Sequence, residues 1–390
     1  MTDWHLKYGL NPHQGHAVAR FPDGDEWLRV LNGQVGYINL LDAMRAWTLA
    51  RELATTLGVP SAASIKHVHP AGAAVARPLD ERFRVAHAIG DADLSPLGTA
   101  YARARAGDRI AAFGDFIGLS ETVDASCARL IAREVSDGVI APAYAADALH
   151  ILSKKKNGSY IILQADPEFS SSAIEMRREN GIELQQAANR AVVAAQLFAH
   201  GATGTIPSPA EAIADLQLAT IVVKHTPSNA VCLSYDGQAI GIGGGQQARI
   251  HATRSACEKA DLWRLQLHPR AAEVRASDGA GRTAQFNLVR QWLLWDELSE
   301  RERAALRAAT SGLPQPLTRD ERREWLEASA LIAMSSDGYI PFADNVDRAA
   351  RSGVRVIAQP GGSKQDDLVT AAADAAGIAM IHTGLRLFWH

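Results

Sequence analysis

Short apolar runs alternate with longer segments of helical periodicity along most of the chain. An apolar run at residues 59–65 predicts a buried strand, and a helix is expected to begin near Asn39, whose side chain could cap it. The same pattern predicts further strands at 109–113, 139–141, 160–163, 219–223, 354–358 and 378–382, and helices at 99–105, 123–135, 145–152, 209–217 and 344–352. Strands that alternate with helices indicate an α/β fold with a parallel or mixed sheet.

The order of elements in residues 110–163 recurs in residues 336–382, and an apolar run followed by Lys-His occurs at Lys66-His67 and again at Lys224-His225. This repeat indicates an internal duplication into two α/β units. We place the units at residues 1–165 and 166–390. The second unit is interrupted at about 260–325 by a segment rich in Trp, Leu, Arg and Glu, which predicts a helical insertion with a charged outer face.

Composition narrows the class of protein further. The chain has 390 residues, of which 47% are hydrophobic, and a formal net charge of −3. Such a chain can bury a sizeable core, and its near-neutral charge argues against an obligatory nucleic-acid partner. No apolar run is long enough for a membrane span, and the first residues lack a signal pattern. Three cysteines without metal or redox spacing argue against disulfides, so a soluble cytoplasmic protein is expected.

The most informative polar group follows the predicted strand at 59–65. Lys66, His67 and His69 come directly after it and before Pro70. In open α/β sheets ligands bind beyond the carboxyl ends of strands. A fixed positive charge beside a group that titrates near neutrality suits a reaction in which an oxyanion develops while an amine loses a proton. The alternatives are a solvated loop or a metal site, but zinc needs three or four ligands and none lie nearby in sequence.

Other polar turns are candidates for ligand contacts. Residues 5–14 crowd hydrogen-bond donors and form either an ordinary loop or a cradle for phosphate. A glycine-rich run precedes Arg249, which on a first helical turn could reach a carboxylate or phosphate. This run is not a dinucleotide fingerprint, because Gln246 stands where the last glycine is required. Asp137 is expected in a turn, either bonding its own backbone or fixing a ligand amine.

Taken together, these stretches resemble the AICAR formyltransferase (aminoimidazole carboxamide ribonucleotide formyltransferase) domain of the bifunctional purine-biosynthesis enzyme over essentially the whole chain. The motifs that carry the resemblance occur in the same order and are Lys7-Tyr8-Gly9, Asn11 to Gln14, Leu31-Asn32-Gly33, Ile38-Asn39, Lys66-His67-Val68, Phe113 to Phe116, Arg133 to Gly138, Ser153 to Gly158, Ser228 to Val231, Gly241 to His251, Pro341-Phe342, Asp344-Asn345, and Arg386 to Phe388 with His390.

The resemblance implies a pair of cytidine-deaminase-like α/β units without the deaminase zinc, and a homodimer with active sites at the subunit interface. It implies transfer of the formyl group of 10-formyltetrahydrofolate to the 5-amino group of AICAR, so the expected partners are these two small molecules. The cyclohydrolase half of the family is absent from the sequence, and ring closure is expected from a separate IMP cyclohydrolase.

The resemblance also implies roles for individual residues. His67 is similar to the residue that takes the amine proton, Lys66 to the one that assists it or stabilises the oxyanion, and Asn229 to the one that steers the formyl group. The implied substrate contacts are Lys7, Tyr8, Asn39, Asp137, Arg249, Arg386 and His390, and the implied folate contacts are Phe113, Gly114, Pro341, Phe342, Asn345 and Ser363. Some relatives hold potassium near the residues that match Val223, Ser228, Asp337 and His390; no other metal is expected.

Three positions depart from the family pattern and keep alternatives open. Lys7 stands where Arg is frequent, which loses bidentate phosphate geometry. His69 and Ala343 stand where relatives often carry Asn or Ser, and Arg. These changes leave room for a formyltransferase that acts on another amino-heterocycle, and a catalytically silent nucleotide-binding protein is a third reading. A zinc deaminase is disfavoured because the required Cys pair is absent.

Overall fold

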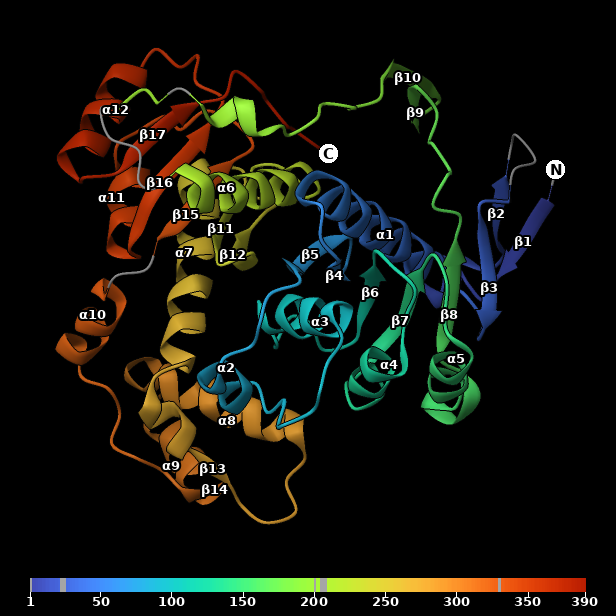
Figure 1. The fold of residues 1–390 in the computed structure, drawn as a ribbon, viewed down its shortest axis with the longest axis horizontal. Helices are drawn as coiled ribbons and strands as arrows, with labels where there is room; N and C mark the ends of the chain where they lie inside the picture. The colour runs from blue at the N-terminus through green and yellow to red at the C-terminus, as the bar shows by residue number, and fades with distance from the viewer. Residues whose placement is uncertain (1, 22–25, 200, 204–208, 329–330) are drawn as a thin grey trace.

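One mixed sheet of 11 strands runs through the part of the chain that a computed structural model describes, which is residues 2–21, 26–199, 201–203, 209–328 and 331–390. Its strand order is β17-β16-β15-β11-β12-β5-β4-β6-β7-β8-β3 (Figure 1). The strands are β3 (Leu28–Asn32), β4 (Ser61–Lys66), β5 (His69–Val75), β6 (Asp115–Leu119), β7 (Ser136–Ala141), β8 (Ile161–Ala165), β11 (Val231–Tyr235), β12 (Gln238–Gly243), β15 (Ile332–Ser336), β16 (Val354–Gln359) and β17 (Ala379–His382).

Strand directions repeat on the two sides of the β5–β12 pair. On one side, the β4–β5 hairpin is followed by three parallel strands, β6, β7 and β8, with β6 antiparallel to β4. On the other side, the β11–β12 hairpin is followed by parallel β15, β16 and β17, with β15 antiparallel to β11. The two halves of the sheet are joined through β5 and β12, where Gln238 pairs with Ala74.

Helices cover both faces of this sheet. Buried residues of α1 (Tyr37–Leu57) and α6 (Pro209–Lys224) belong to the hydrophobic cluster on one face. The cluster on the other face takes residues from α3 (Pro96–Ala106), α4 (Ala125–Ala132), α5 (Ala146–Ser153), α7 (Arg249–Gln266), α11 (Asp344–Arg351) and α12 (Asp366–Ala375). Helix α1 lies directly on β6, where a Cβ at Gly118 would stand 2.2 Å from the Ala46 carbonyl oxygen.

A third hydrophobic cluster, which includes the buried Trp292, lies beyond the end of α7. It is built from the end of α7 and the segment that follows, at the lower left of Figure 1. That segment contains β13 (Arg275–Ala276), α8 (Arg282–Leu293), α9 (Glu300–Ala308), β14 (Thr310–Gly312) and α10 (Arg319–Glu327). The exposed residues of α10 are all charged, and those of α9 are charged or Ala.

Smaller elements complete the described chain. The N-terminal hairpin of β1 (Thr2–Leu6) and β2 (Ala17–Phe21) lies beside β3, and the β9 (Ile174–Glu179) and β10 (Ile182–Ala187) hairpin projects away from the main sheet (Figure 1). The rest are α2 (Glu81–Ala86) and the 3-10 helices η1 (Pro12–Gln14), η2 (Lys155–Gly158), η3 (Ala195–Phe198), η4 (Pro269–Glu273) and η5 (Trp295–Glu297). No helix among the described residues is both long and apolar enough to cross a membrane.

Two predicted strands are wrong. Residues 219–223 are the last turns of α6, a helix buried on several sides, and periodicity cannot distinguish such a helix from a buried strand. Lys224-His225 therefore ends a helix, and its likeness to Lys66-His67 is not structural. Residues 109–113 form turns, with Ile110 and Phe113 exposed, and the strand is β6 at Asp115–Leu119.

Asn39 does not cap α1 in the way that the sequence pattern indicated. The N-cap residue is Gly36, and Asn39 lies in the first turn, where its Oδ1 accepts the Gly36 N–H at 3.0 Å. The side chain still satisfies a backbone donor at the helix start, but from inside the helix.

Candidate functional site

The residues proposed for the site lie in loops along one edge of the sheet. Because β4 is antiparallel to β6, the carboxyl end of β4 meets the amino ends of β6, β7 and β8. In the other half, the same edge holds the carboxyl ends of β15, β16 and β17. Of the predicted residues at this edge, Lys66 ends a strand, and Arg249, Pro341 and Phe342 follow strand carboxyl ends. Phe113, Gly114, Asp137 and Asn229 instead lie at strand amino ends.

The tip of the β4–β5 hairpin presents the predicted proton acceptor. Lys66 ends β4, His69 begins β5, and His67 and Val68 form the turn between them. His67 is exposed, and its carbonyl oxygen lies 2.7 Å from His69 Nδ1. The imidazole of His67 is therefore open to a ligand at this edge.

Lys66 and the predicted folate residues Phe113 and Gly114 come together beside this tip. The Lys66 ammonium donates to the Phe113 carbonyl oxygen and lies 6.0 Å from the centre of the Phe113 ring. A Cβ at Gly114, which has a φ of 78°, would stand 4.0 Å from Lys66 Nζ. The carbonyl holds the ammonium in place at the edge, next to an aromatic ring that is 45% exposed.

Lys7, Tyr8 and Asn39 meet at the start of α1. The Lys7 N–H donates to the Val35 carbonyl at 3.0 Å, and the Tyr8 carbonyl accepts the Tyr37 N–H at 3.3 Å. Lys7 Nζ lies 5.9 Å from the centre of the Tyr8 ring, and both side chains are exposed. The backbone bonds thus place a lysine and a phenol at a helix N-terminus, where the helix dipole favours an anion.

Asp137 is the second residue of β7 and not a turn residue as expected. On this edge it pairs with Lys156, which the sequence pattern did not indicate as a site residue. Lys156 Nζ lies 2.8 Å from Asp137 Oδ1, with the two side chains 39% and 49% exposed. An ion pair this exposed contributes little to stability. Because both side chains are this exposed, both groups are accessible to a polar ligand.

Asn229 and Arg249 belong to a second cluster, at the start of β11 and of α7. Arg249 is buried; its Nη2 donates to Asn229 Oδ1 at 2.6 Å, and its Nη1 donates to the Asp337 carboxylate. The Asn229 Nδ2 group donates to the carbonyl oxygens of Gln246 and Gln247 at 2.7 and 3.1 Å. Arg249 thus orients the Asn229 side-chain amide, and both of its Nη groups are hydrogen-bonded to protein atoms.

The C-terminal segment packs against this second cluster. Ser228 donates its N–H to the Trp389 carbonyl at 3.0 Å, and its Oγ donates to Asp337 Oδ2 at 2.6 Å. Trp389 stacks on Arg45 of α1, with the guanidinium carbon 3.6 Å from the ring centre. Arg386 and His390 are both exposed beside Phe388, so these two predicted substrate residues lie at the surface of the second cluster.

The remaining predicted folate residues follow β15 and β16. Phe342 is 63% exposed, and Pro341 is half-buried. Asn345 is buried, and its Oδ1 accepts from Thr253 Oγ1 at 2.7 Å, so it shapes the loop from within. Ser363 is partly buried, and its Oγ accepts the Gln365 N–H at 3.1 Å.

His69 links the two clusters within one chain. A Cβ added at Gly245, in the loop that precedes Arg249, would stand 3.2 Å from the His69 Nε2, so the two loops lie close together. Elsewhere the predicted residues spread widely. At about 4.8 Å per strand spacing, Asp137 on β7 and Asn229 at β11 are five spacings or roughly 24 Å apart. Ser363, after β16, lies two spacings further.

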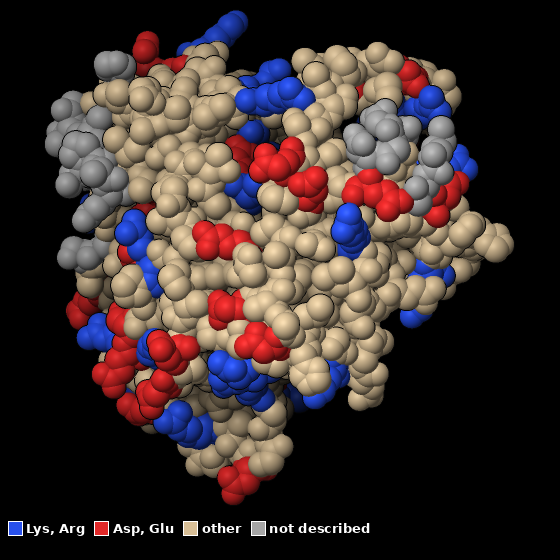
Figure 2. Space-filling model, turned by 45° about the vertical axis from the view of Figure 1, so that its right-hand side comes forward, with Lys and Arg blue, Asp and Glu red and all other residues tan. Residues whose placement is uncertain are grey.

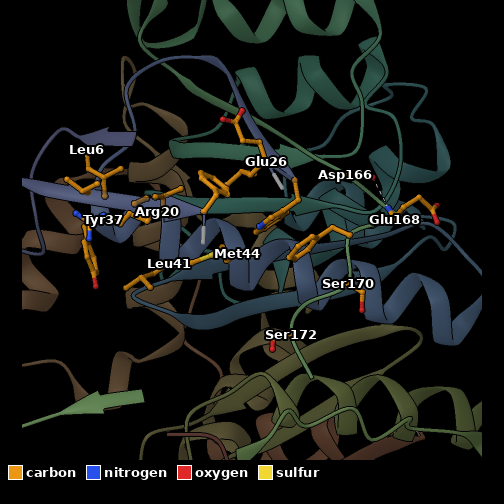
Figure 3. A pocket seen from close by; sticks show the side chains of 17 residues that line it. Leu6, Arg20, Glu26, Tyr37, Leu41, Met44, Asp166, Glu168, Ser170 and Ser172 are labelled. Carbon is orange, nitrogen blue, oxygen red and sulfur yellow. Dashed lines mark hydrogen bonds between the residues drawn. The ribbon is translucent and has the colours of Figure 1, made fainter. Parts of the chain in front are cut away.

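A separate cavity of about 900 Å³ lies near the start of α1 but away from His67. Figure 3 shows that side chains of β1, β2 and α1, including Leu6, Tyr37 and Met44, line one side of it. The segment that carries Ser170 and Ser172 lines the other, so the cavity contains none of the predicted catalytic residues. Its lining mixes apolar side chains with charged and hydroxyl groups, and Trp27 and Phe169 stack there with ring centres 4.6 Å apart.

The described residues hold no cluster of three or more His, Cys, Asp or Glu side chains that could bind a metal ion. Figure 2 shows Lys and Arg interspersed with Asp and Glu over the face that it draws. Asp337 is paired with Arg249 and Ser228, so its charge is already balanced within the protein.

Sequence reasoning missed Asp42, a buried carboxylate beneath the His67 turn. Its Oδ1 accepts the Val68 N–H at 2.7 Å. Burial raises the pKa of the Asp42 carboxyl above its ordinary value, although the N–H groups of Val68 and His67 partly oppose this. One signal was available: Asp42 lies three residues after Asn39 in the same helix, so the two side chains share a face.

Comparison with known proteins places this arrangement in a family. Residues 2–259 match the family model described as AICARFT/IMPCHase bienzyme. This chain belongs to that family. It is 32% identical over 391 residues to the bifunctional purine biosynthesis protein PurH of Roseobacter denitrificans, a match that covers 99% of this chain and 59% of the relative.

Other members of the family give the same result. The PurH proteins of Cereibacter sphaeroides and Mesorhizobium japonicum are 32% and 31% identical to this chain, again over 99% of its length. The chain thus spans about three fifths of the length of the curated relatives that it matches (59% and 58%). The family match includes both the His67 hairpin and the Asn229–Arg249 cluster.

Proposed function

We propose that the chain transfers the formyl group of 10-formyltetrahydrofolate to the 5-amino group of AICAR, giving the formylated nucleotide and tetrahydrofolate. The observation that carries this proposal is the placement of Lys66 and His67 at one sheet edge, across His69 from the Asn229–Arg249 cluster, in a chain of this family. The proposal concerns formyl transfer alone and assigns ring closure to no described residue.

The chemistry needs an activated amine and a stabilised oxyanion. The amine nitrogen attacks the formyl carbon, whose oxygen becomes an oxyanion. His67 takes the proton that the amine loses, and the Lys66 ammonium stabilises the negative charge. The bond from the formyl carbon to the folate N10 then breaks, and N10 takes a proton. Alignment of the two reactants supplies much of the rate gain, and one good donor to the oxyanion contributes roughly 3 kcal/mol.

The other predicted residues have binding roles in this proposal. Lys7, Tyr8 and Arg386 hold the phosphate. Asn39, Asp137, Arg249 and His390 contact the rest of the nucleotide, with Arg249 acting through Asn229, which it orients. Phe113, Gly114, Pro341, Phe342 and Ser363 form the folate pocket, and Asn345 supports its loop from the interior.

The fold part of the proposal is that the two halves of the sheet are duplicated cytidine-deaminase-like units, at residues 1–165 and 166–390. The repeated strand directions about β5 and β12 support it. Three buried cysteines without a disulfide favour the reducing environment of the cytoplasm, where we place the enzyme.

A direct assay tests the activity. Purified protein with 10-formyltetrahydrofolate and AICAR should release tetrahydrofolate and form the formylated nucleotide, detected by absorbance and mass spectrometry. A panel of other aminoimidazoles in the same assay tests the alternative acceptor, for which the Lys7, His69 and Ala343 departures leave room. Activity with a panel member and none with AICAR would replace the proposal, and AICAR binding without turnover would support a silent nucleotide-binding protein.

Potassium is a smaller part of the proposal, at Val223, Ser228, Asp337 and His390. A hydroxyl, a backbone carbonyl and a carboxylate that already pairs with Arg249 suit a weakly held monovalent ion better than a divalent one. The same assay in potassium and sodium buffers tests this site, and equal rates and melting temperatures would remove it.

We also propose a homodimer whose active sites combine residues of both subunits. The spread of the predicted residues along the edge supports this, because an AICAR molecule cannot span roughly 24 Å from Asp137 to Asn229 within one chain. The β9–β10 ribbon gives further support. All 12 of its residues are exposed, with Ile174 and Met176 on one face and Ile182 and Leu184 on the other. An isolated two-stranded ribbon is only marginally stable in water, so we expect a second copy of the chain to pack against it.

Mixing two inactive variants tests the shared site. Asp137→Ala and Asn229→Ala subunits, unfolded together and refolded, should recover about a quarter of wild-type activity, because half of the dimers are mixed and each then has one intact site. Each variant refolded alone is the control, and light scattering should give about twice the 41.8 kDa chain mass. A monomeric mass, or no recovery in mixtures that contain mixed dimers, would refute the shared site.

A further inference from the structure

The turn that carries His67 has an unfavourable backbone. His67 and Val68 have φ values of 53° and 66°, in the left-handed region. A β-branched residue such as Val is a genuine outlier there, because its Cβ substituents crowd the backbone. Such conformations persist only where the surrounding structure holds them, and they cluster at functional sites.

Asp42 is the group that holds this turn. It projects from the second turn of α1, is 6% exposed, and accepts the Val68 N–H at 2.7 Å. Burial raises the pKa of the Asp42 carboxyl, and the backbone N–H groups of Val68 and His67, with the charge of the His67 imidazole, partly oppose this. The negative charge of Asp137, on β7, also raises the pKa of Asp42, and Lys66 and His69 flank His67 on the hairpin itself.

The other half of the sheet also has an aspartate beneath a hairpin turn, but the turn residues there adopt positive φ readily. Asp215 of α6 accepts the N–H groups of Asp236 and Gly237 at 2.9 and 2.7 Å, in the turn between β11 and β12. Asp236 and Gly237 have φ values of 47° and 72°, which Asp tolerates and Gly adopts freely. This turn lies at the opposite edge of the sheet, because β12 begins where β5 ends.

The contrast separates two roles. An aspartate beneath a hairpin turn belongs to the architecture of both halves, but only the half with the proposed catalytic pair places His and Val in the turn. If the turn at residues 67 and 68 had only a structural role, Asp and Gly would give a more stable turn than His and Val. The residues at 67 and 68 therefore depend more on their aspartate than the residues at 236 and 237 do.

We propose that Asp42 is the positioning residue of His67: its buried carboxylate fixes the left-handed His67–Val68 turn and so sets where the imidazole stands relative to the acceptor amine. This inference rests on the proposed function for its catalytic consequence, but the hold on the turn is a property of the protein alone. In this proposal Asp42 acts through His67 and contacts neither substrate.

The test compares two matched substitutions, Asp42→Asn and Asp215→Asn. Each replaces one carboxylate oxygen beneath a hairpin turn by an amide nitrogen, so both should lower the free energy of unfolding by similar amounts, measured by urea unfolding. Asp42→Asn should lower kcat by about 100-fold, with KM for AICAR and for the folate changed less than about threefold, because a small misplacement of a reacting group costs this much. Asp215→Asn should keep kcat within about twofold of wild type.

A second substitution checks that the turn conformation is the cause. Val68→Gly in the Asp42→Asn background lets residue 68 adopt positive φ without the carboxylate, so it should recover at least about tenfold of the lost kcat. A kcat for Asp42→Asn within about threefold of that for Asp215→Asn would overturn the proposal. Absence of recovery by Val68→Gly would overturn it as well.

Hydrogen exchange gives a readout that does not depend on activity. In Asp42→Asn, the peptide that contains residues 66–70 should exchange faster than in wild type, while peptides from β11 and β12 stay unchanged. Unchanged exchange at 66–70 would also refute the hold by Asp42. If wild-type protein fails to formylate AICAR, the proposed function fails, whereas the exchange result still decides whether Asp42 fixes the turn.

Discussion

His67→Ala is expected to lower kcat for AICAR formylation by about a thousandfold, while the affinity for AICAR changes little. General acid–base catalysis by one positioned side chain contributes about 10²- to 10⁴-fold. His67 is exposed at the hairpin tip, beside a lysine whose ammonium is fixed on the Phe113 carbonyl, and no part of the core depends on its ring. The substitution should therefore remove proton transfer without disturbing the fold.

Steady-state release of tetrahydrofolate measures kcat, and calorimetry with AICAR measures binding. His150→Ala, at an exposed histidine of α5, is the matched control and should leave both unchanged. Lys66→Met should also lower kcat, by roughly 3 kcal/mol of lost oxyanion stabilisation if the lysine acts alone on the oxyanion. Turnover by His67→Ala at the wild-type rate would remove His67 from the mechanism.

The second large effect concerns stability. Glu134→Ala should lower the free energy of unfolding by about 3–5 kcal/mol, because it leaves the buried Arg109 guanidinium without its counter-ion, although Arg105 keeps its ion pair with Asp115. Glu134 lies 3.2 Å from Arg105, 2.8 Å from Arg109 and 2.9 Å from Arg282, the last of which belongs to α8. Urea unfolding at neutral pH measures the change. Glu300→Ala, which breaks an ion pair whose carboxylate is 80% exposed, should cost less than about 1 kcal/mol.

The same group gives a pH dependence with a defined sign. Burial alone would raise the pKa of Glu134, but Arg109, Arg105 and Arg282 outweigh it and lower the pKa to about 2. A carboxyl whose pKa is depressed in the folded state stabilises the protein above its ordinary pKa near 4.5 and loses that contribution as pH falls toward 2. Wild type should therefore lose about 3 kcal/mol more than Glu134→Ala over this range, and parallel pH profiles would contradict the assignment.

Sequence patterns identified the elements whose periodicity is distinctive. Residues 354–358 and 344–352, predicted as strand and helix, correspond to β16 and α11 within two residues at either end. The strand at 219–223 was wrong because α6 is buried on several sides and carries the β-branched residues Thr220, Ile221, Val222 and Val223, which also suit a strand. In such a segment the tertiary environment, which the local pattern does not contain, decides between helix and strand.

The candidate site was predicted as a set of residues but not as a geometry. Motif order was enough to name Lys66, His67 and Asn229, yet the distribution of the site along one sheet edge depends on strand order, which requires the fold. Asp42 was missed because its importance comes from a backbone conformation at His67 and Val68 that no residue type there announces. The residue types His and Val do not indicate a two-residue turn with positive φ, since turns of this kind favour Asn, Asp and Gly.

The junction between β5 and β12 has a mechanical consequence. The sheet is continuous there through the pairing of Gln238 with Ala74, reinforced by the Gln238 amide, which donates to the Arg103 carbonyl at 2.8 Å. His69 and Gly245 face each other at one end of this junction. A ligand that contacted both sides would connect the two halves of the sheet across this narrow junction, so its binding is expected to raise the stability of the whole sheet and not of one half alone.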